Sequence, residues 1–315
     1  MVRRVCVVAF MIAVVAGSVP ALAQIALPVQ FLPVVARAAG VNSLWRTDVS
    51  ITNITNSSVT VTAAYLPEAQ TNFPPLKYTH QITLQSKQTI LIEDVVGKWF
   101  SQFGNNTKGA MFIYAEQPSL GKDLVFGQGL SWVQSKGTAS PSLVVTSRTY
   151  NAANPDATYG QTVPANPYSF FMGIAAGEMT GMREDDHFRT NIGVVNLSGL
   201  TAPVQITVYG PSGQLLAQKT ENVEGFSLRQ WNLKREFGVT NLQDGLVEVK
   251  VDPSVANQDP CGDTAGALSP LLVAYYSKND NATGDAEFGI AQVDWRQYSV
   301  ECQESPSDQC PTIGQ

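Results

Sequence analysis

A block of sequence that occurs twice constrains the fold of this chain more than any other feature. Residues 45–53 (WRTDVSITN) return 143 residues later as residues 188–196 (FRTNIGVVN), with the Arg, the first Thr and the final Asn in place. After a loop two residues longer in the second copy, residues 59–63 (VTVTA) match residues 204–208 (VQITV). Self-similarity at a fixed offset is typical of duplicated structural units. We therefore expect two units of similar fold.

Later parts of the two copies match as well. Residues 109–114 (GAMFIY) correspond to residues 245–250 (GLVEVK), and residues 147–152 (SRTYNA) correspond to residues 277–282 (SKNDNA). A chain of 315 residues is long enough for two domains of ordinary size. The predicted organisation is a first domain at 25–163, a linker with two prolines at 164–167, a second domain at 168–298 and a polar tail at 299–315.

Side chains alternate along the repeated block. The inner side of the first copy holds Trp45, Thr47, Val49 and Ile51, and the outer side holds Arg46, Asp48, Ser50 and Thr52. The second copy keeps this phase, and a period of two is typical of half-buried strands. Gly, Pro, Asn and Ser clusters separate further β-rich runs, and short helical turns are expected at 95–100 and 233–237.

These patterns predict an all-β protein. The expected architecture is two tandem antiparallel Ig-like β-sandwich domains of about seven strands each. A two-domain β-barrel protein is the alternative that the pattern leaves open.

The first residues have the three parts of a secretory signal peptide. Arg3 and Arg4 precede apolar residues 5–19, and a small-residue site ends at Ala23, after which we expect cleavage. The apolar stretch is shorter than the about 20 residues of a membrane-spanning helix, so we expect no membrane span in the mature chain. We expect the mature chain to be secreted or periplasmic. Removing residues 1–23 changes the net charge from −6 to −8. This charge disfavours nucleic acid and other polyanions as partners.

Three of the four cysteines remain after such cleavage: Cys261, Cys302 and Cys310. Outside the cytosol a disulfide between two of them is the default expectation, and all three pairings stay open. A bridge from Cys261 to either later cysteine would attach the tail to the second domain. A zinc site is the rival interpretation, but the chain has no Cys-x-x-Cys pair and neither His lies near these cysteines.

A resemblance to a known module rests on a small set of residues. They are residues 34–37 (VVAR), 45–48 (WRTD), 147–150 (SRTY) and 159–161 (YGQ), together with Asn53. This pattern resembles an Ig-like repeat module of secreted bacterial proteins that opens with a Trp-Arg-Thr-Asp strand and occurs in tandem or beside secreted hydrolases. The resemblance covers most of the mature chain. It implies an extracellular, largely uncharacterised accessory domain and no catalytic residues, and the second copy departs from it at Phe188 and Asn191.

Charged side chains give the first candidates for binding. Arg46 and Arg189 lie on the outer face of the repeated strand, where pairing across strands is the structural role and contact with a ligand the functional one. Glu184, Asp185 and Asp186 are the densest group of oxygen ligands, which Ca²⁺ prefers. Because the first copy lacks these acids, we favour a solvated loop, and we expect no cofactor.

Tryptophans give the second candidates. Trp132 and Trp295 stand beside polar residues and are candidates for exposed stacking on sugar rings. Trp45 is on the inner side of its strand, and Trp99 and Trp231 lie near the expected helical turns, so core packing is the preferred role for these three.

Enzyme motifs are missing from the sequence. It contains no Gly-x-Ser-x-Gly, His-Glu-x-x-His or P-loop, and His80 and His187 are its two histidines. The two carboxylates that cleave glycosides come together only in the folded protein, so no spacing in the sequence tests for them. We therefore expect a secreted, non-enzymatic interaction, adhesion or structural module whose partner is an extracellular protein or a polysaccharide. The alternative is a carbohydrate-binding accessory protein, with calcium assistance as an option, and a cryptic hydrolase is third.

Overall fold

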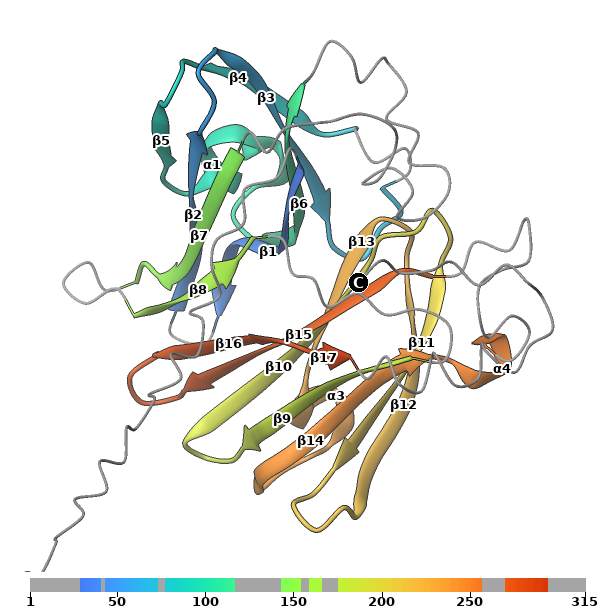
Figure 1. Ribbon diagram of the computed structural model, residues 1–315. Helices are drawn as coiled ribbons and strands as arrows, with labels where there is room; N and C mark the ends of the chain where they lie inside the picture. Colours follow the sequence, from blue (N-terminus) through green and yellow to red (C-terminus); the bar gives the residue numbers. More distant parts are fainter. Residues whose placement is uncertain are drawn as a thin grey trace, which may run out of the picture.

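The described chain consists almost entirely of β-strands. The computed structural model describes residues 29–40, 43–72, 77–116, 143–153, 159–165, 175–256 and 270–293. Every strand pair within these ranges is antiparallel. The all-β class predicted from the sequence is confirmed, and Figure 1 shows the strands gathered in stacked sheets.

Residues 29–165 are called the N-terminal half below, and residues 175–293 the C-terminal half. The N-terminal half contains β1 (Val29–Gly40), β2 (Ser43–Asn53), β3 (Val59–Pro67), β4 (Thr79–Leu84), β5 (Thr89–Ile92), α1 (Val95–Trp99), η1 (Ser101–Phe103), β6 (Thr107–Glu116), β7 (Leu143–Asn151) and β8 (Gly160–Pro164). The C-terminal half contains β9 (Ala176–Glu184), β10 (Phe188–Asn196), β11 (Ala202–Tyr209), β12 (Leu215–Val223), β13 (Ser227–Asn232), α3 (Leu233–Phe237), β14 (Leu242–Val251), α4 (Pro253–Ala256), β15 (Leu272–Asp280), β16 (Ala286–Ile290) and β17 (Gln292–Val293).

Strands of the two halves pair in the same order. The N-terminal half forms one sheet in the order β4-β3-β6-β1-β2-β7-β8, with β5 paired to β2. The C-terminal half has a β12-β11-β14-β9-β17 sheet and a separate β13-β10-β15-β16 sheet. The N-terminal strands that match these two sheets are β4-β3-β6-β1 and β2-β7-β8 with β5. They form one sheet because residues 37–40 of β1 pair with residues 43–46 of β2. The domain boundaries drawn at 25–163 and 168–298, with a linker at 164–167, stay a prediction.

Burial along the repeated block differs between the halves. In β2 the inner residues Thr47, Val49 and Ile51 are buried and the residues between them are half-buried, as the alternation predicts. In β10 every residue from Ile192 to Asn196 is buried. Both faces of this part of β10 are therefore covered, which the alternation did not indicate.

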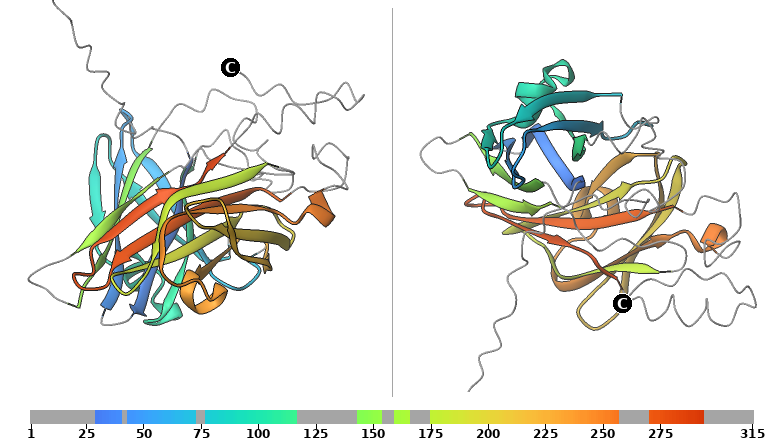
Figure 2. Two further views of the ribbon diagram at one scale, coloured as in Figure 1. Left: turned by 90° about the horizontal axis from the view of Figure 1, so that it is seen from below. Right: turned by 45° about the horizontal axis from the view of Figure 1, so that its top comes forward.

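Three apolar cores explain this difference. One lies inside the N-terminal half and includes Val49, and one lies inside the C-terminal half and includes Ile192. The third, called the interface core, contains Phe31, Val34, Ala64, Leu66, Ala110, Phe112, Tyr114 and Val163 from the N-terminal half and Val195, Phe226, Leu228, Val273 and Tyr275 from the C-terminal half. The β13-β10-β15-β16 sheet thus has a core on each face, and Figures 1 and 2 show it between the N-terminal half and the β12-β11-β14-β9 strands.

The interface core is apolar enough to hold the halves together. Leu66 and Tyr275 are 0% exposed, and Phe112 is 2% exposed. Full burial of one large apolar side chain contributes roughly 1.5–3 kcal/mol, and a hydrophobic interface is what prevents independent motion of two domains. We therefore expect the halves to move as one body.

Short helices lie between strands where the sequence indicated them. α1 follows β5 and leads to Phe100, which is 1% exposed in the N-terminal core, and α3 follows β13. The residue before each helix caps it. Asp94 Oδ1 accepts from Gly97 N at 3.1 Å, and Asn232 Oδ1 accepts from Arg235 N at 3.0 Å. Asp94 and Asn232 consequently occupy equivalent places in the two halves.

A loop of the N-terminal half is hydrogen-bonded to the start of β13 and to the turn that precedes it. Ala69 N donates to Leu228 O at 3.1 Å. Asn72 N donates to Gly225 O at 3.0 Å, and Asn72 Nδ2 donates to Phe226 O at 2.9 Å. The Asn72 side chain is 2% exposed. These bonds satisfy backbone groups at the edge of the interface core, where an unpaired polar group would be costly.

Asn72→Ala is expected to lower the free energy of unfolding by about 1–3 kcal/mol, because the buried Phe226 carbonyl loses the Asn72 donor. Urea denaturation followed by circular dichroism measures the change. Asn222→Ala, at an exposed place on β12, is the matched control and should stay within about 0.5 kcal/mol of the wild type. A loss for Asn72→Ala as small as that of the control would contradict the role given to Asn72.

Candidate functional site

A cleft opens between the two halves beside the interface core. Its volume is about 730 Å³, within the range of about 300–1,000 Å³ typical of small-molecule sites. The N-terminal half contributes the paired ends of β1 and β2 and the end of β7. The C-terminal half contributes β10, β13, α3, β15 and the turns that follow β9 and β15. Neither half forms the cleft alone.

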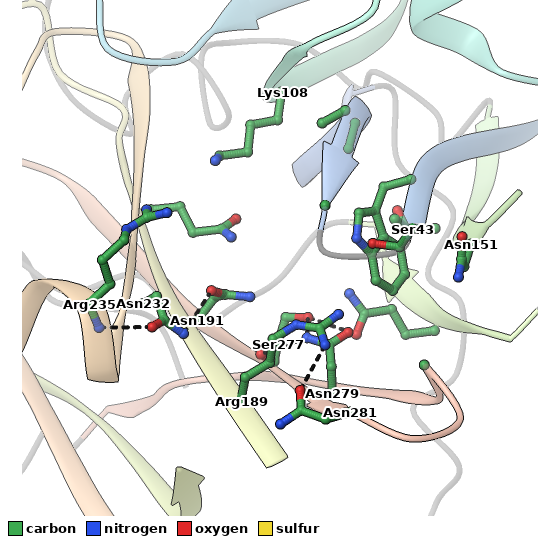
Figure 3. A pocket seen from close by; sticks show the side chains of 18 of the residues that line it. Ser43, Lys108, Asn151, Arg189, Asn191, Asn232, Arg235, Ser277, Asn279 and Asn281 are labelled. Atoms are coloured by element: carbon green, nitrogen blue, oxygen red, sulfur yellow. Dashed lines mark hydrogen bonds between the residues drawn. The ribbon is translucent and has the colours of Figure 1, made fainter. Parts of the chain in front are cut away.

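Amide side chains reach the cleft from both halves. Figure 3 shows Asn151 of the N-terminal half on one side and Asn191, Asn232, Asn279 and Asn281 of the C-terminal half on the other. Each amide carries two N–H donors and an oxygen acceptor. Groups of this kind recognise a polar ligand through hydrogen bonds in both directions.

Two buried polar atoms of the cleft have no hydrogen-bond partner among the described residues. They are Ser43 Oγ, on a side chain 6% exposed, and Asn279 Oδ1, on a side chain 2% exposed. Glu224 Oε2 is a further such atom, but it lies outside the cleft and 3.5 Å from Arg229 Nε. Because buried polar atoms are normally paired, these two atoms are exceptions within the lining of the cleft.

The floor of the cleft is tied to the interface core. Tyr275 belongs to that core, and its ring lies so close to Gly193 that a Cβ there would collide with it. Its hydroxyl donates to Gln230 Oε1 at 3.0 Å. Nearby, Ser277 Oγ donates to Gln161 Oε1 at 3.2 Å and so joins the halves. The contacts that pack the halves therefore also position the cleft side chains.

The structure separates the two arginines predicted as ligand candidates. Arg189 lines the cleft, and its Nη1 donates to Asn281 Oδ1 at 2.8 Å. Burial lowers the pKa of Arg189, and the negative charge of Glu184 opposes that shift. Arg46 lies outside the cleft, with its Nε 3.4 Å from Asp94 Oδ2. Arg189 thus lines the cleft, and Arg46 pairs with Asp94 inside the N-terminal half.

Glu184 is a buried carboxyl at the edge of the cleft. Its side chain is 2% exposed, and Oε2 accepts from Thr190 N at 2.7 Å. Burial raises the pKa of Glu184, while the Thr190 hydrogen bond and the positive charges of Lys234 and Arg189 lower it in part. Its carboxylate is therefore held by the backbone of β10.

The other acids of this loop close the turn between β9 and β10. Asp185 Oδ2 accepts from Arg183 Nε at 2.7 Å, which lowers the pKa of Asp185, and Oδ1 accepts from His187 N at 2.7 Å. Asp186 is exposed. Within the described residues, no three His, Cys, Asp or Glu side chains gather to hold a metal ion. The loop predicted as a weak calcium candidate is organised here as a hydrogen-bonded turn.

The tryptophans follow the sequence interpretation in part. Trp231 is 6% exposed in the C-terminal core. Trp99 packs against the N-terminal core, and the centroid of its ring lies 4.6 Å from that of the His80 ring. The assignment of Trp45 to the core was wrong, because it is half-buried and lines the cleft. Trp45 lies where β2 pairs with the end of β1, beyond the residues of the N-terminal core.

Several predicted features fall outside the described residues. They are Trp132, Trp295, Cys261, Cys302, Cys310, the leader at 1–23 and the tail at 299–315. In the described ranges, no helix has the length and apolar character needed to cross a membrane.

The cleft was not predicted from the sequence because the contact between the two halves was not predicted. Two uninterrupted apolar runs, residues 109–115 (GAMFIYA) and 271–275 (LLVAY), were the available signal. Such runs are typical of strands with both faces covered, whereas alternation is typical of strands with one face in solvent.

Comparison with known proteins yields no family. No protein-family model and no curated protein matches the chain. A predicted secreted protein of Parabacteroides distasonis is similar over 78% of this chain and 75% of its own, at 10% identity and a TM-score of 0.19. Procruciferin, an 11S globulin of Brassica napus, is similar over 89% of this chain and 82% of its own, at 7% identity and a TM-score of 0.22. Likenesses this remote indicate no ligand.

Arg46→Ala is expected to lower the free energy of unfolding by about 0.5–1 kcal/mol, because Asp94 loses one of its cationic partners. Arg189→Ala is expected to lower it less, because no ion pair joins Arg189 to a described carboxylate. Urea denaturation of both variants beside the wild type measures the difference. A larger loss for Arg189→Ala than for Arg46→Ala would refute this division of roles.

Glu184→Gln is expected to gain stability over the wild type as the pH rises from about 4 to about 7. A carboxyl whose folded pKa lies above its ordinary value of 4.5 stabilises the fold at low pH, and this contribution is lost as the pH rises. The amide oxygen of glutamine can still accept from Thr190 N. Urea midpoints at both pH values test this, with Glu178→Gln at an exposed place on β9 as control. An equal midpoint difference at both pH values would speak against a raised pKa.

Proposed function

We propose that the chain is an extracellular, non-enzymatic binding module built from two repeated Ig-like β-sandwich domains, and that its ligand binds in the cleft between them. The observation that carries the proposal is the pair of unpartnered buried atoms, Ser43 Oγ and Asn279 Oδ1. They come from different halves, and one ligand in the cleft would supply both missing hydrogen bonds. The matching strand order supports the repeat, and the predicted signal peptide at 1–23 supports a secreted or periplasmic location.

Binding is a better use of this cleft than catalysis. His80 stacks on Trp99 in the N-terminal half, and His187 is exposed in the turn between β9 and β10. The carboxylates of Glu184 and Asp185 already accept hydrogen bonds from the backbone. A general base needs free access to the proton that it removes. The carboxylates of Glu184 and Asp185 are instead engaged in holding the turn between β9 and β10.

One observation favours carbohydrate as the ligand class, which is the second candidate function. The cleft is concave and presents amides together with the half-buried indole of Trp45. Sugar hydroxyls donate and accept hydrogen bonds as amides do, and sugar rings pack on aromatic side chains. A protein partner would more commonly need a broad surface with an apolar centre.

Ala39→Trp is expected to abolish binding, because Ala39 is exposed at the cleft and an indole there would occupy its volume. Leu91→Trp, on β5 and 60% exposed outside the cleft, is the matched control and should bind as the wild type does. An array of neutral and acidic oligosaccharides, incubated with the chain lacking residues 1–23, measures binding.

Mass spectrometry of the same oligosaccharides after incubation tests for cleavage. Full binding by Ala39→Trp would exclude the cleft as the site. Cleavage of any oligosaccharide would contradict a non-enzymatic function, and binding to none would contradict carbohydrate as the ligand class.

A further inference from the structure

An arginine occurs at the same place in both halves, but its neighbours differ. Arg46 of β2 corresponds to Arg189 of β10 in the repeated block. Two places near this arginine hold carboxylates in the N-terminal half and amides in the C-terminal half: Asp48 corresponds to Asn191, and the helix cap Asp94 corresponds to the helix cap Asn232. The positive charge is kept in both halves, while both matching negative charges are absent from the second.

In the N-terminal half Asp94 pairs with two arginines, and Asp48 in turn holds the backbone of Asp94. Asp94 forms an ion pair with Arg37, and its Oδ2 lies 3.4 Å from Arg46 Nε. Asp48 Oδ1 accepts from Asp94 N at 2.8 Å. Arg46 Nη1 also donates to the carbonyl of the preceding residue at 2.8 Å. The guanidinium is therefore committed to its own half.

In the C-terminal half the amides bond with one another and leave the arginine available. Asn232 Nδ2 donates to Thr190 O at 3.2 Å and lies 3.5 Å from Asn191 Oδ1. Arg189 donates to Asn281 Oδ1, and no described carboxylate forms an ion pair with it. Figure 3 shows its guanidinium among the cleft amides. A partly desolvated guanidinium gains most from a carboxylate, which it binds through two parallel hydrogen bonds.

Other charges around the cleft limit how much negative charge it accepts. The negative charge of Glu184 acts on Arg189 at a distance, without an ion pair between them. Asp186 is exposed at the edge of the cleft. Lys234 is the cleft cation that balances them in part. The remaining charges of the lining are already paired, namely Asp185 with Arg183, Lys108 with Glu68 and Arg235 with Glu236. This balance suits one carboxylate better than a polyanion, in line with the net charge of −6.

The rest of the cleft needs partners that donate and accept hydrogen bonds. Asn279 Oδ1 requires a donor, and Ser43 Oγ can pair with a donor or an acceptor. Hydroxyl groups meet both requirements, and Trp45 offers an aromatic surface beside Ser43. One carboxylate together with several hydroxyls on a ring describes a uronic acid.

We propose that the cleft binds a saccharide carrying one carboxylate, such as a terminal uronic acid, and that Arg189 holds the carboxylate while the amides hold the hydroxyls. This inference rests on the proposed function, because it names the ligand of the same cleft.

Calorimetric titration with disaccharides ending in one glucuronic or galacturonic acid, each beside its methyl ester, tests the proposal. The ester keeps the shape of the sugar and removes its charge. The wild type is expected to bind one of the acids at least about tenfold more tightly than its ester, because a hydrogen bond to a charged group is worth more than one to a neutral group. Equal affinities for acid and ester would overturn the inference and leave the binding function standing.

Variants assign the effect to Arg189. Arg189→Gln should reduce the acid-to-ester preference to about one, and Asn191→Asp should weaken binding of the acid more than of the ester by repulsion. Arg46→Gln, at the matching place of the N-terminal half, should keep the full preference. A preference retained by Arg189→Gln would overturn the assignment to Arg189.

Failure of the uronic acid inference can be distinguished from failure of carbohydrate recognition as a whole. Binding of neutral oligosaccharides on the array without binding of either acid would overturn this inference alone, whereas binding of no saccharide at all would also contradict carbohydrate recognition by the cleft. The comparison of acid with ester on the wild type needs no substitution, so a variant that fails to fold does not remove the test.

Discussion

Both faces of the β13-β10-β15-β16 sheet are covered along β10 and the first part of β15, and the rest of the molecule is arranged around this constraint. One face closes the core of the C-terminal half, and the other packs on β1, β3 and β6 of the N-terminal half. Leu66, Phe112 and Tyr275 lie at this second contact with almost no exposed surface. Because packed cores resist deformation, the contact fixes the distance between the halves. The cleft lies beside this contact and is lined by residues of both halves.

The two halves share a strand order and differ in chemistry where they border the cleft. In the N-terminal half Asp94 draws Arg37 and Arg46 into an ion-pair cluster beneath α1. In the C-terminal half Asn232 keeps the capping role of Asp94, since an amide oxygen caps a helix as a carboxylate does, but it cannot neutralise Arg189. The same backbone framework thus supports a closed ionic cluster in the N-terminal half and amide side chains that line the cleft in the C-terminal half.

Local patterns in the sequence indicated local structure correctly. The period of two placed Val49 and Ile51 inside, and the helical turns were expected where α1 and α3 occur. Burial that depends on distant contacts was not indicated: Trp45 has the right phase for the core, yet β2 extends beyond that core. No spacing rule could bring Ser43 and Asn279 to one cleft, because their proximity follows from how two sheets pack.

The interface core is expected to make the two halves one cooperative body and so to preform the cleft. Hydrogen exchange of the unliganded chain, measured by mass spectrometry under native conditions, tests it most directly. The slowest amides of β3 and β6 in one half and of β10 and β15 in the other are expected to open with the same free energy. Separate opening, with one half exchanging fully while the other stays protected, would contradict it.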